Sequence, residues 1–168
     1  MKNLILLSSF LLLTNLLLSQ GWDPIEYCYS NNKKIVSELN IDSLENVLLD
    51  KINTFRQENG LNVLTLDSSL YKYSMGWNYS MYSEKNIEHS NISNYNIIAE
   101  NVYMTISFGN FPMEKDYVYS ISDRIFNGWL SSKKHKENML NKDVTKIGVS
   151  ILMIPNGMID EYSTMVVN

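Results

Sequence analysis

Residues 129–140 read Trp-Leu-Ser-Ser-Lys-Lys-His-Lys-Glu-Asn-Met-Leu, and they contain His135, one of the two histidines in the chain. The other is His89, in the triplet Glu88-His89-Ser90, and the triplet Ala99-Glu100-Asn101 lies between the two histidines. A pair of imidazoles and a carboxylate can form a small cluster if the fold brings them together. The candidate site therefore consists of His89, Glu100 and His135, and its existence depends on how the intervening segments fold.

The composition is that of one globular domain. The chain has 168 residues, which is enough for a single hydrophobic core. Cys28 is the single cysteine, so an exported monomer has no internal disulfide and its core must supply the stability. The formal net charge of −4 argues against nucleic acid as a partner, because phosphate binding requires a basic face.

The N-terminal residues have the pattern of a secretory signal peptide. Lys2 gives a positive start, residues 4–18 are rich in leucine, and Ser19-Gln20 offers a cleavage point. Since this apolar run is short for a membrane span, we expect residues 1–20 to be removed, with an uncleaved N-terminal anchor as the alternative. Residues 21–41 are expected to form a spacer and residues 42–168 the folded domain. The processed protein is expected to be extracellular or periplasmic, without a stable membrane span.

The first helix of the domain has clear start and stop signals. Asp42 is the expected N-cap, and Glu45 stands three residues later, as in a capping box. Apolar residues then recur at helical spacing as far as Phe55. Gly60 is the expected left-handed residue that ends this helix.

The later segments combine helical and strand-like patterns. The expected elements are a helix from Asp67 or Ser68 to about Met81, a loop over 83–96, a short strand over 97–104, a helix over 117–130, and a hairpin with strands at 146–154 and 158–167. The hairpin is antiparallel and the helices outnumber the strands. These patterns predict an α+β fold in which helices pack on a small antiparallel sheet.

Taken together, these segments resemble the CAP superfamily (cysteine-rich secretory proteins, antigen 5 and pathogenesis-related 1), also called the SCP domain. The resemblance covers about 43–167 and is carried by residues 53–61, Leu64, Leu66-Asp67, Leu70, Trp77, Met81, His89-Ser90, Glu100-Asn101-Val102, 129–138 and 146–149. The spacing Trp-x-x-Ser-x-x-His-x-x-Asn-x-Leu in residues 129–140 is similar to the bacterial-type, disulfide-poor branch. The single cysteine agrees with that branch.

The resemblance implies an α-β-α sandwich with a cleft that holds two histidines and two acidic residues. His89, Glu100 and His135 match three of these positions, and the fourth, a glutamate in many eukaryotic members, falls on Ser132. The missing carboxylate implies weaker divalent-metal affinity, or water in its place. The resemblance also implies a secreted, non-catalytic protein that binds a lipid, a sterol or a partner protein, with Tyr103–Tyr119 as an apolar loop over a cavity.

Two interpretations of the three candidate residues stay open. Neutral imidazoles can ligate Zn²⁺ or a similar ion, and a carboxylate can either ligate the ion or orient one ring by accepting its other N–H. Because two histidines and one glutamate make a marginal zinc site, any metal is expected to bind weakly. In the purely structural interpretation, His89 and Glu100 bond to the backbone and His135 caps the turn after the third helix.

Other polar and aromatic residues near these motifs have structural interpretations. Asn101 and Asn138 are expected to anchor the backbone of turns through their side-chain amides. Trp77 and Trp129 lie on apolar helical stripes and are expected in the core. Arg56 could pair with Glu58 or with a more distant acid, and nothing nearby in the sequence chooses between them.

A hydrolase is the alternative function. Ser132 precedes His135 by three residues and could face it on a helical turn, with Glu100 as the third member of a Ser132–His135–Glu100 triad. The sequence has no Gly-x-Ser-x-Gly elbow. The non-catalytic interpretation is therefore preferred.

Overall fold

The computed structural model describes residues 41–107, 115–155 and 159–168. The expected signal peptide, residues 1–20, and nearly all of the expected spacer lie outside these ranges. The described elements are α3 (Ile41–Glu58), β1 (Thr65–Leu66), α4 (Ser68–Glu84), the 3-10 turn η1 (Ile92–Asn94), β2 (Ala99–Ser107), α5 (Lys115–Ser131), α6 (Lys133–Met139), β3 (Lys146–Pro155) and β4 (Ile159–Val167).

The four strands form one sheet in the order β1-β3-β4-β2. β4 pairs antiparallel with both β3 and β2, which confirms the predicted C-terminal hairpin. The two-residue strand β1 pairs parallel with the start of β3. The sheet is therefore mixed, and the prediction of a wholly antiparallel sheet was wrong at this edge.

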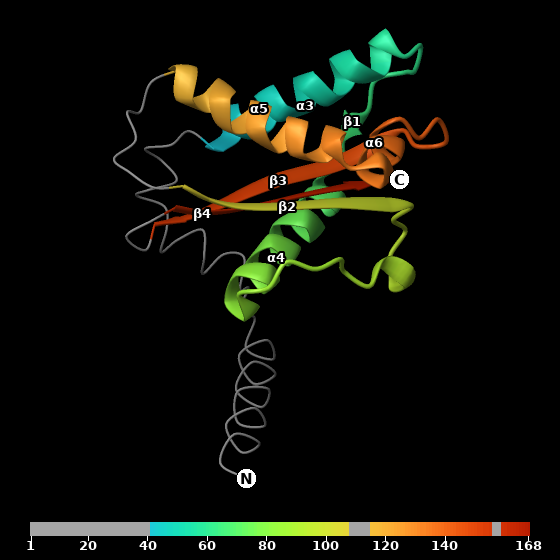
Figure 1. Ribbon diagram of the computed structural model, residues 1–168. Coiled ribbons are helices and arrows are strands. Elements are labelled where there is room, and N and C mark those ends of the chain that lie inside the picture. The colour runs from blue at the N-terminus through green and yellow to red at the C-terminus, as the bar shows by residue number, and fades with distance from the viewer. Residues whose placement is uncertain (1–40, 108–114, 156–158) are drawn as a thin grey trace.

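Helices cover both faces of the sheet, as an α-β-α sandwich requires. α3 and α5 lie on one face and α4 lies on the other (Figure 1). Successive side chains of β3 point to opposite faces of the sheet, which explains this arrangement. One face contributes Ile147, Val149 and Ile151 to the core under α3 and α5. The other face contributes Leu152 and Ile154 to a second apolar cluster, which includes Met81 of α4. The predicted fold class is confirmed.

The start of α3 differs from the prediction. The described helix begins at Ile41, so Asp42 lies inside it and is not the residue just before it. Oε1 of Glu45 instead accepts a hydrogen bond from the backbone N–H of Ile151 at 2.9 Å. β1 pairs with only the first two residues of β3. Glu45 therefore supplies an acceptor to β3 at a position that no strand of the described residues reaches on this side. Gly60, with a φ of +73°, ends the segment as predicted.

α4 begins where the sequence predicts and packs very closely on the sheet. Asp67 is its N-cap, and its side chain accepts the N–H groups of Ser69 and Leu70. The helix continues one turn beyond the predicted end, to Glu84. At Gly148 of β3, an added Cβ would lie 2.1 Å from the carbonyl carbon of Leu70. The absence of a side chain at Gly148 is what lets helix and strand approach this closely.

The segment after α5 folds differently from the prediction. His135 lies within a separate short helix, α6, and not in a turn. Trp129, at the end of α5, is fully buried, which confirms its assignment to the core. Among the helices in the described ranges, none combines the length and apolar character needed to cross a membrane.

Candidate functional site

The candidate site lies at strand β2, which pairs with β4 and stands last in the order of the sheet. Glu100 is the second residue of β2 and is 5% exposed. His89 lies in the loop between α4 and β2, and His135 lies on α6, which packs against β2. Three separate segments therefore bring the predicted residues to one place.

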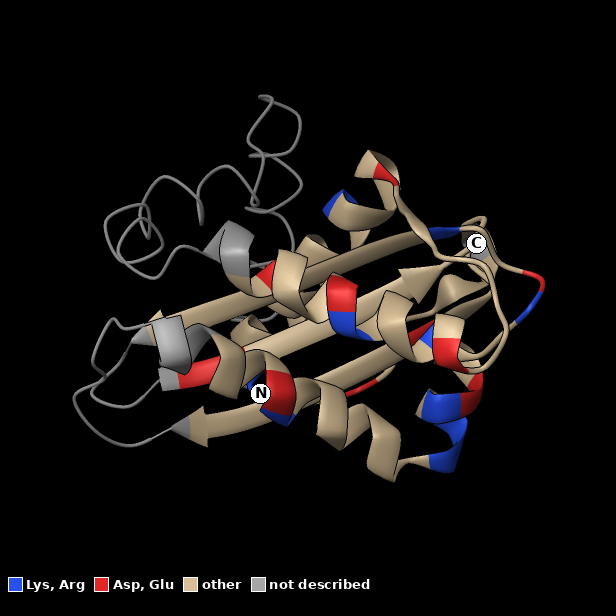
Figure 2. Ribbon diagram, turned by 90° about the horizontal axis from the view of Figure 1, so that it is seen from above, with Lys and Arg blue, Asp and Glu red and all other residues tan. Residues whose placement is uncertain are grey.

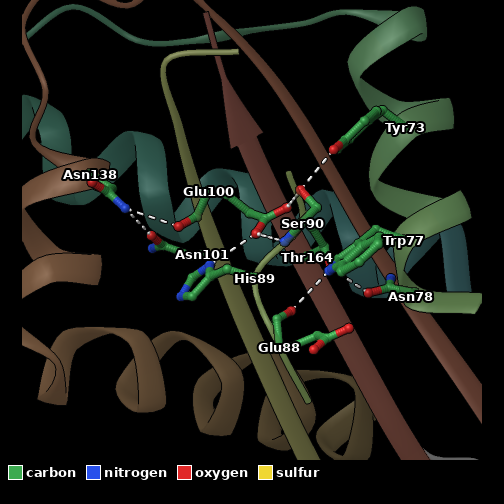
Figure 3. Close-up of polar contacts among 10 residues, drawn as sticks. All are labelled: Tyr73, Trp77, Asn78, Glu88, His89, Ser90, Glu100, Asn101, Asn138 and Thr164. Carbon is green, nitrogen blue, oxygen red and sulfur yellow. Dashed lines mark hydrogen bonds and ion pairs between the residues drawn. The ribbon is translucent and has the colours of Figure 1, made fainter. Parts of the chain in front are cut away.

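Glu100 is the centre of a hydrogen-bonded cluster (Figure 3). Its Oε1 lies 2.9 Å from Nδ1 of His89 and accepts the backbone N–H of Ser90, also at 2.9 Å. The hydroxyl of Ser90 donates to Oε2 of Glu100 in a short hydrogen bond. Since both carboxylate oxygens have partners, Glu100 orients His89 through its Nδ1–H and leaves the Nε2 atom of that ring as the remaining ligand atom.

α4 holds the histidine loop from the other side. The hydroxyl of Tyr73 donates to Oγ of Ser90 at 2.7 Å, and the indole N–H of Trp77 donates to the carbonyl of Glu88 at 3.0 Å (Figure 3). The Tyr73 and Ser90 hydroxyls and the Glu100 carboxylate thus form a chain from α4 to β2. Burial raises the pKa of the Tyr73 hydroxyl, so it remains a donor at neutral pH. Sequence patterns did not indicate this role for Tyr73.

The ring of His135 lies beside that of His89. Their centroids are 5.7 Å apart, with an angle of 64° between the ring planes. Burial lowers the pKa of His135 below its ordinary value, and the charge of His89 lowers it further, whereas Glu100 acts in the opposite direction. His135 is therefore a neutral imidazole at pH 7, as a metal ligand must be.

Two asparagines join α6 to β2. The side-chain amide of Asn101 donates to the carbonyl of His135 at 3.0 Å. The amide of Asn138 donates to the carbonyl of Glu100 at 3.0 Å and to Oδ1 of Asn101 at 2.9 Å. Both asparagines are buried and anchor the backbone as predicted, but they lie in strand β2 and helix α6 and not in turns. They fix the distance between the strand that carries Glu100 and the helix that carries His135.

Arg56 of α3 holds the end of α6. It is 1% exposed, and its guanidinium donates to the carbonyls of Asn62, Met139 and Asn141 at 2.7–2.8 Å. The sequence suggested an acidic partner for Arg56, near or distant, but these hydrogen bonds all go to backbone carbonyls. A guanidinium has five N–H donors in a fixed fork, which explains how one side chain satisfies three carbonyls.

The described contacts of Ser132 and Glu100 differ from those of the hypothesised Ser132–His135–Glu100 triad. Oγ of Ser132 accepts the backbone N–H of His135 at 3.4 Å, as the N-cap of α6. Glu100 bonds to the ring of His89 instead of that of His135. The described contacts of Ser132 and Glu100 thus serve the first turn of α6 and the orientation of His89.

The described part of the chain holds no complete metal site. Within residues 41–107, 115–155 and 159–168, no group of three or more His, Cys, Asp and Glu side chains could hold a metal ion. Three lysines flank His135 on α6, where Figure 2 shows basic residues gathered at one end of the molecule. The imidazoles of His89 and His135 lie beside each other, and the Glu100 carboxylate contacts only the first of them among the described contacts.

The lowered pKa of His135 leads to a prediction about stability. The unfolded chain binds a proton at His135 with the ordinary pKa of about 6.5, whereas the folded protein resists this protonation. Stability should therefore fall as the pH drops below about 6.5, by at most about 1.4 kcal/mol per pH unit from this group. Urea unfolding at several pH values, for wild type and His135→Gln, measures the effect. Equal pH dependence in both proteins would contradict the assignment.

Comparisons with known proteins agree on one family. A family model described as the cysteine-rich secretory protein family, CAP, matches residues 49–167. An uncharacterized protein of Borreliella burgdorferi is 27% identical over 124 residues, which make up 64% of this chain and 70% of that protein.

Solved structures show the same fold. An outer surface protein from Borrelia burgdorferi is similar with a TM-score of 0.55 and 22% identity, over 73% of this chain and 90% of that chain. NaASP2, solved with Zn²⁺, is similar with a TM-score of 0.56 and 13% identity, over 75% of this chain and 79% of that chain. At sequence identities of 22% and 13%, the similarity to these structures is a similarity of fold.

Proposed function

Because the chain belongs to the cysteine-rich secretory protein (CAP) family, we propose that it is a secreted, non-catalytic binding module that holds a divalent metal ion weakly between His89 and His135. Glu100 orients His89 in this proposal, and water or a bound partner completes the coordination. The leucine-rich residues 4–18 support export, as does the similarity to an outer surface protein.

The observation that carries the metal proposal is the approach of the two rings. Two imidazoles on one Zn²⁺, with Zn–N distances of about 2.0–2.1 Å, have centroids roughly 5–6 Å apart. The separation of 5.7 Å falls in this range. The hydrogen bond of Glu100 to Nδ1 of His89 is the outer-shell contact that metal-ligating histidines usually make. Zn²⁺ is the ion present with the similar NaASP2.

Several features favour weak affinity. Ser132 stands where the family pattern has a glutamate, and its hydroxyl caps α6. The exposed Lys133, Lys134 and Lys136 add positive charge near the site and oppose a cation. The protein would therefore load metal at micromolar concentrations and exchange it readily.

Calorimetric titration with Zn²⁺ near neutral pH tests this proposal. We expect micromolar binding to the wild type, no measurable binding to His89→Ala or His135→Ala, and about tenfold or greater weakening in Glu100→Gln. Lys134→Ala, an exposed neighbour of His135 on α6, is the control and should bind at least as well as the wild type. Absence of heat with the wild type, or unchanged affinity in either histidine variant, would contradict the shared site.

An apolar ligand is a second candidate function, and a specific groove favours it. A cavity of about 540 Å³ lies between α3 and α5 and is lined by Phe55, Phe126 and Leu130, among others. An ion pair of 2.7 Å between Lys51 and Asp123 joins the two helices beside it. This volume is typical of small-molecule sites. Of the apolar loop predicted at Tyr103–Tyr119, residues 108–114 lie outside the described residues, whereas 103–107 belong to β2 and 115–119 to α5. Tyr119, at its end, lines this groove.

Native mass spectrometry tests for such a ligand. Protein purified from its own host is expected to carry a lipid or sterol mass, which organic extraction removes. Val47→Lys, which places a charge in the wall of the groove, should reduce the fraction that carries the ligand. A bare protein mass in the wild type would count against this function.

A further inference from the structure

Tyr73 also lines a second cavity, which involves none of the three candidate site residues. It has a volume of about 590 Å³ and lies beside the start of α4, and its walls include Asp67, Lys72, Tyr73, Tyr95, Asn96 and Lys146. A volume of this size accommodates a small molecule. Neither the metal proposal nor the apolar groove uses it.

Two tyrosines form the apolar part of this cavity. The rings of Tyr73 and Tyr95 meet edge to face, with centroids 4.5 Å apart. Tyr95 is 56% exposed, although it already contacts another ring, so its remaining surface is available to a ligand. Leu70, which is 8% exposed, adds a buried apolar wall. The cavity therefore offers a rigid aromatic surface that is only partly covered.

The rim of the cavity is polar and carries both signs of charge. Oδ2 of Asp67 pairs with Nζ of Lys146 at 3.1 Å, and Oδ1 of Asp67 accepts the N–H groups of Ser69 and Leu70. These bonds lower the pKa of Asp67, so it remains a carboxylate. Lys72 and Asn96 add exposed donors and an amide oxygen.

The charges on the rim limit which kinds of ligand this cavity can bind. A purely apolar ligand would desolvate Asp67, Lys72 and Lys146 without replacing their contacts with water, which is unfavourable. Lys72 and Lys146 would attract an anion but Asp67 would repel it, and the reverse holds for a cation. Because Asp67 and Lys146 already pair with each other, a charged ligand of either sign would have to compete with that ion pair. A neutral ligand with one apolar face and an edge of hydroxyls meets none of these penalties.

We propose that this cavity binds a neutral saccharide unit, with the exposed ring of Tyr95 against the C–H face of the sugar and the rim of Asp67, Lys72, Asn96 and Lys146 bonding to its hydroxyls. The hydroxyl groups of a sugar both donate and accept, so they match a rim that carries donors and acceptors. The proposal is independent of metal binding at His89 and His135.

Binding of a ligand in this cavity should be detectable at the backbone amide of Ser90. The hydroxyl of Tyr73 donates to Ser90, and the backbone N–H of Ser90 donates to Glu100. A ligand in contact with Tyr73 therefore changes the surroundings of the Ser90 amide without touching it. Nuclear magnetic resonance spectra of the amides should show shifts at Tyr95, Asn96 and Ser90 together.

The test is an amide titration of the purified, metal-free protein with neutral disaccharides: cellobiose, maltose, lactose and N,N′-diacetylchitobiose. At least one is expected to give saturable shifts at Tyr95, Asn96 and Ser90, with millimolar or tighter affinity. Chitobiose, the cationic counterpart of N,N′-diacetylchitobiose, and cellobiouronic acid, the anionic counterpart of cellobiose, should bind more weakly than their neutral partners. Failure of all four neutral sugars, or equal or tighter binding of the charged ones, would overturn the proposal.

Variants separate stacking from a general loss of structure. Tyr95→Ala is expected to weaken binding about tenfold, which corresponds to about 1.4 kcal/mol, whereas Tyr95→Phe keeps the ring and should keep the affinity. Ile106→Ala is the control, because Ile106 is also an exposed large apolar residue, at 43% exposure, but lies near the end of β2 and lines neither cavity. Unchanged affinity in Tyr95→Ala, or equal losses in Tyr95→Ala and Ile106→Ala, would refute the role of Tyr95.

Discussion

Replacement of Arg56 by methionine is expected to lower the free energy of unfolding by about 3–5 kcal/mol. Methionine retains much of the apolar stem of arginine, so the main loss is three hydrogen bonds from a charged donor. The carbonyl of Met139 is buried, whereas those of Asn62 and Asn141 are partly buried. An unsatisfied buried group costs about 1–3 kcal/mol, and the loss of two charge-assisted hydrogen bonds adds to it. Urea unfolding followed by circular dichroism measures the change.

Arg56→Met should also disturb the candidate site. Two of the three carbonyls, those of Met139 and Asn141, lie at the end of α6 and just beyond it, and α6 carries His135. We therefore expect the contact between His135 and His89 to loosen and Zn²⁺ binding to weaken even below the unfolding transition. Lys134→Met, an exposed change on the same helix, is the control and should alter stability by less than about 0.5 kcal/mol. Losses of similar size in both variants would contradict the role of Arg56.

Gly148→Ala is expected to destabilise the protein by about 3 kcal/mol or more, or to prevent folding. The new Cβ would lie 2.1 Å from the carbonyl carbon of Leu70, 2.3 Å from its oxygen and 2.4 Å from the nitrogen of Tyr71. These are backbone atoms, so no side-chain rotation relieves the clash, and α4 itself must move away from β3. Insertion of a methyl into a packed core typically costs about 1–3 kcal/mol even where side chains can adjust.

Gly128→Ala provides the matched control for Gly148→Ala. A Cβ there would lie 2.3 Å from the ring of Tyr103, a half-buried side chain that can shift. Alanine also gains about 1 kcal/mol over glycine within a helix, which offsets part of the strain in α5. Thermal unfolding should therefore show a much larger loss for Gly148→Ala. A smaller loss for Gly148→Ala than for Gly128→Ala would show that the contact between α4 and β3 is looser than described.

Elements with a long periodic pattern could be predicted from the sequence. α4, α5 and the β3–β4 hairpin each repeat an apolar pattern over several turns or strand periods, and their positions were correct within a few residues. α6 has only seven residues, four of them charged at neutral pH, so it shows no apolar stripe. β1 has two residues and pairs with a segment about eighty positions later. Pairing of this kind depends on the finished fold, and local patterns do not reveal it.

The candidate site could be predicted only in part. Family resemblance indicated His89, Glu100 and His135, and they do lie together, but it did not indicate which partner each one takes. Glu100 bonds to His89 and Ser90 because both residues lie in the loop that α4 holds in place through Tyr73 and Trp77. Likewise, the three carbonyls that Arg56 binds acquire their positions only after α3 and α6 have packed. Such contacts follow from tertiary structure, so residue spacing does not determine them.

The contact of the Glu45 carboxylate with β3 has a consequence for behaviour at high concentration. An uncovered strand can recruit a strand from another molecule and so begin fibrillar or domain-swapped assembly. Here Glu45 occupies the N–H of Ile151, one of the groups that an incoming strand would need. An intruding chain would have to displace a buried carboxylate and find it a new partner. Glu45 is therefore expected to oppose the addition of a strand along this side of β3.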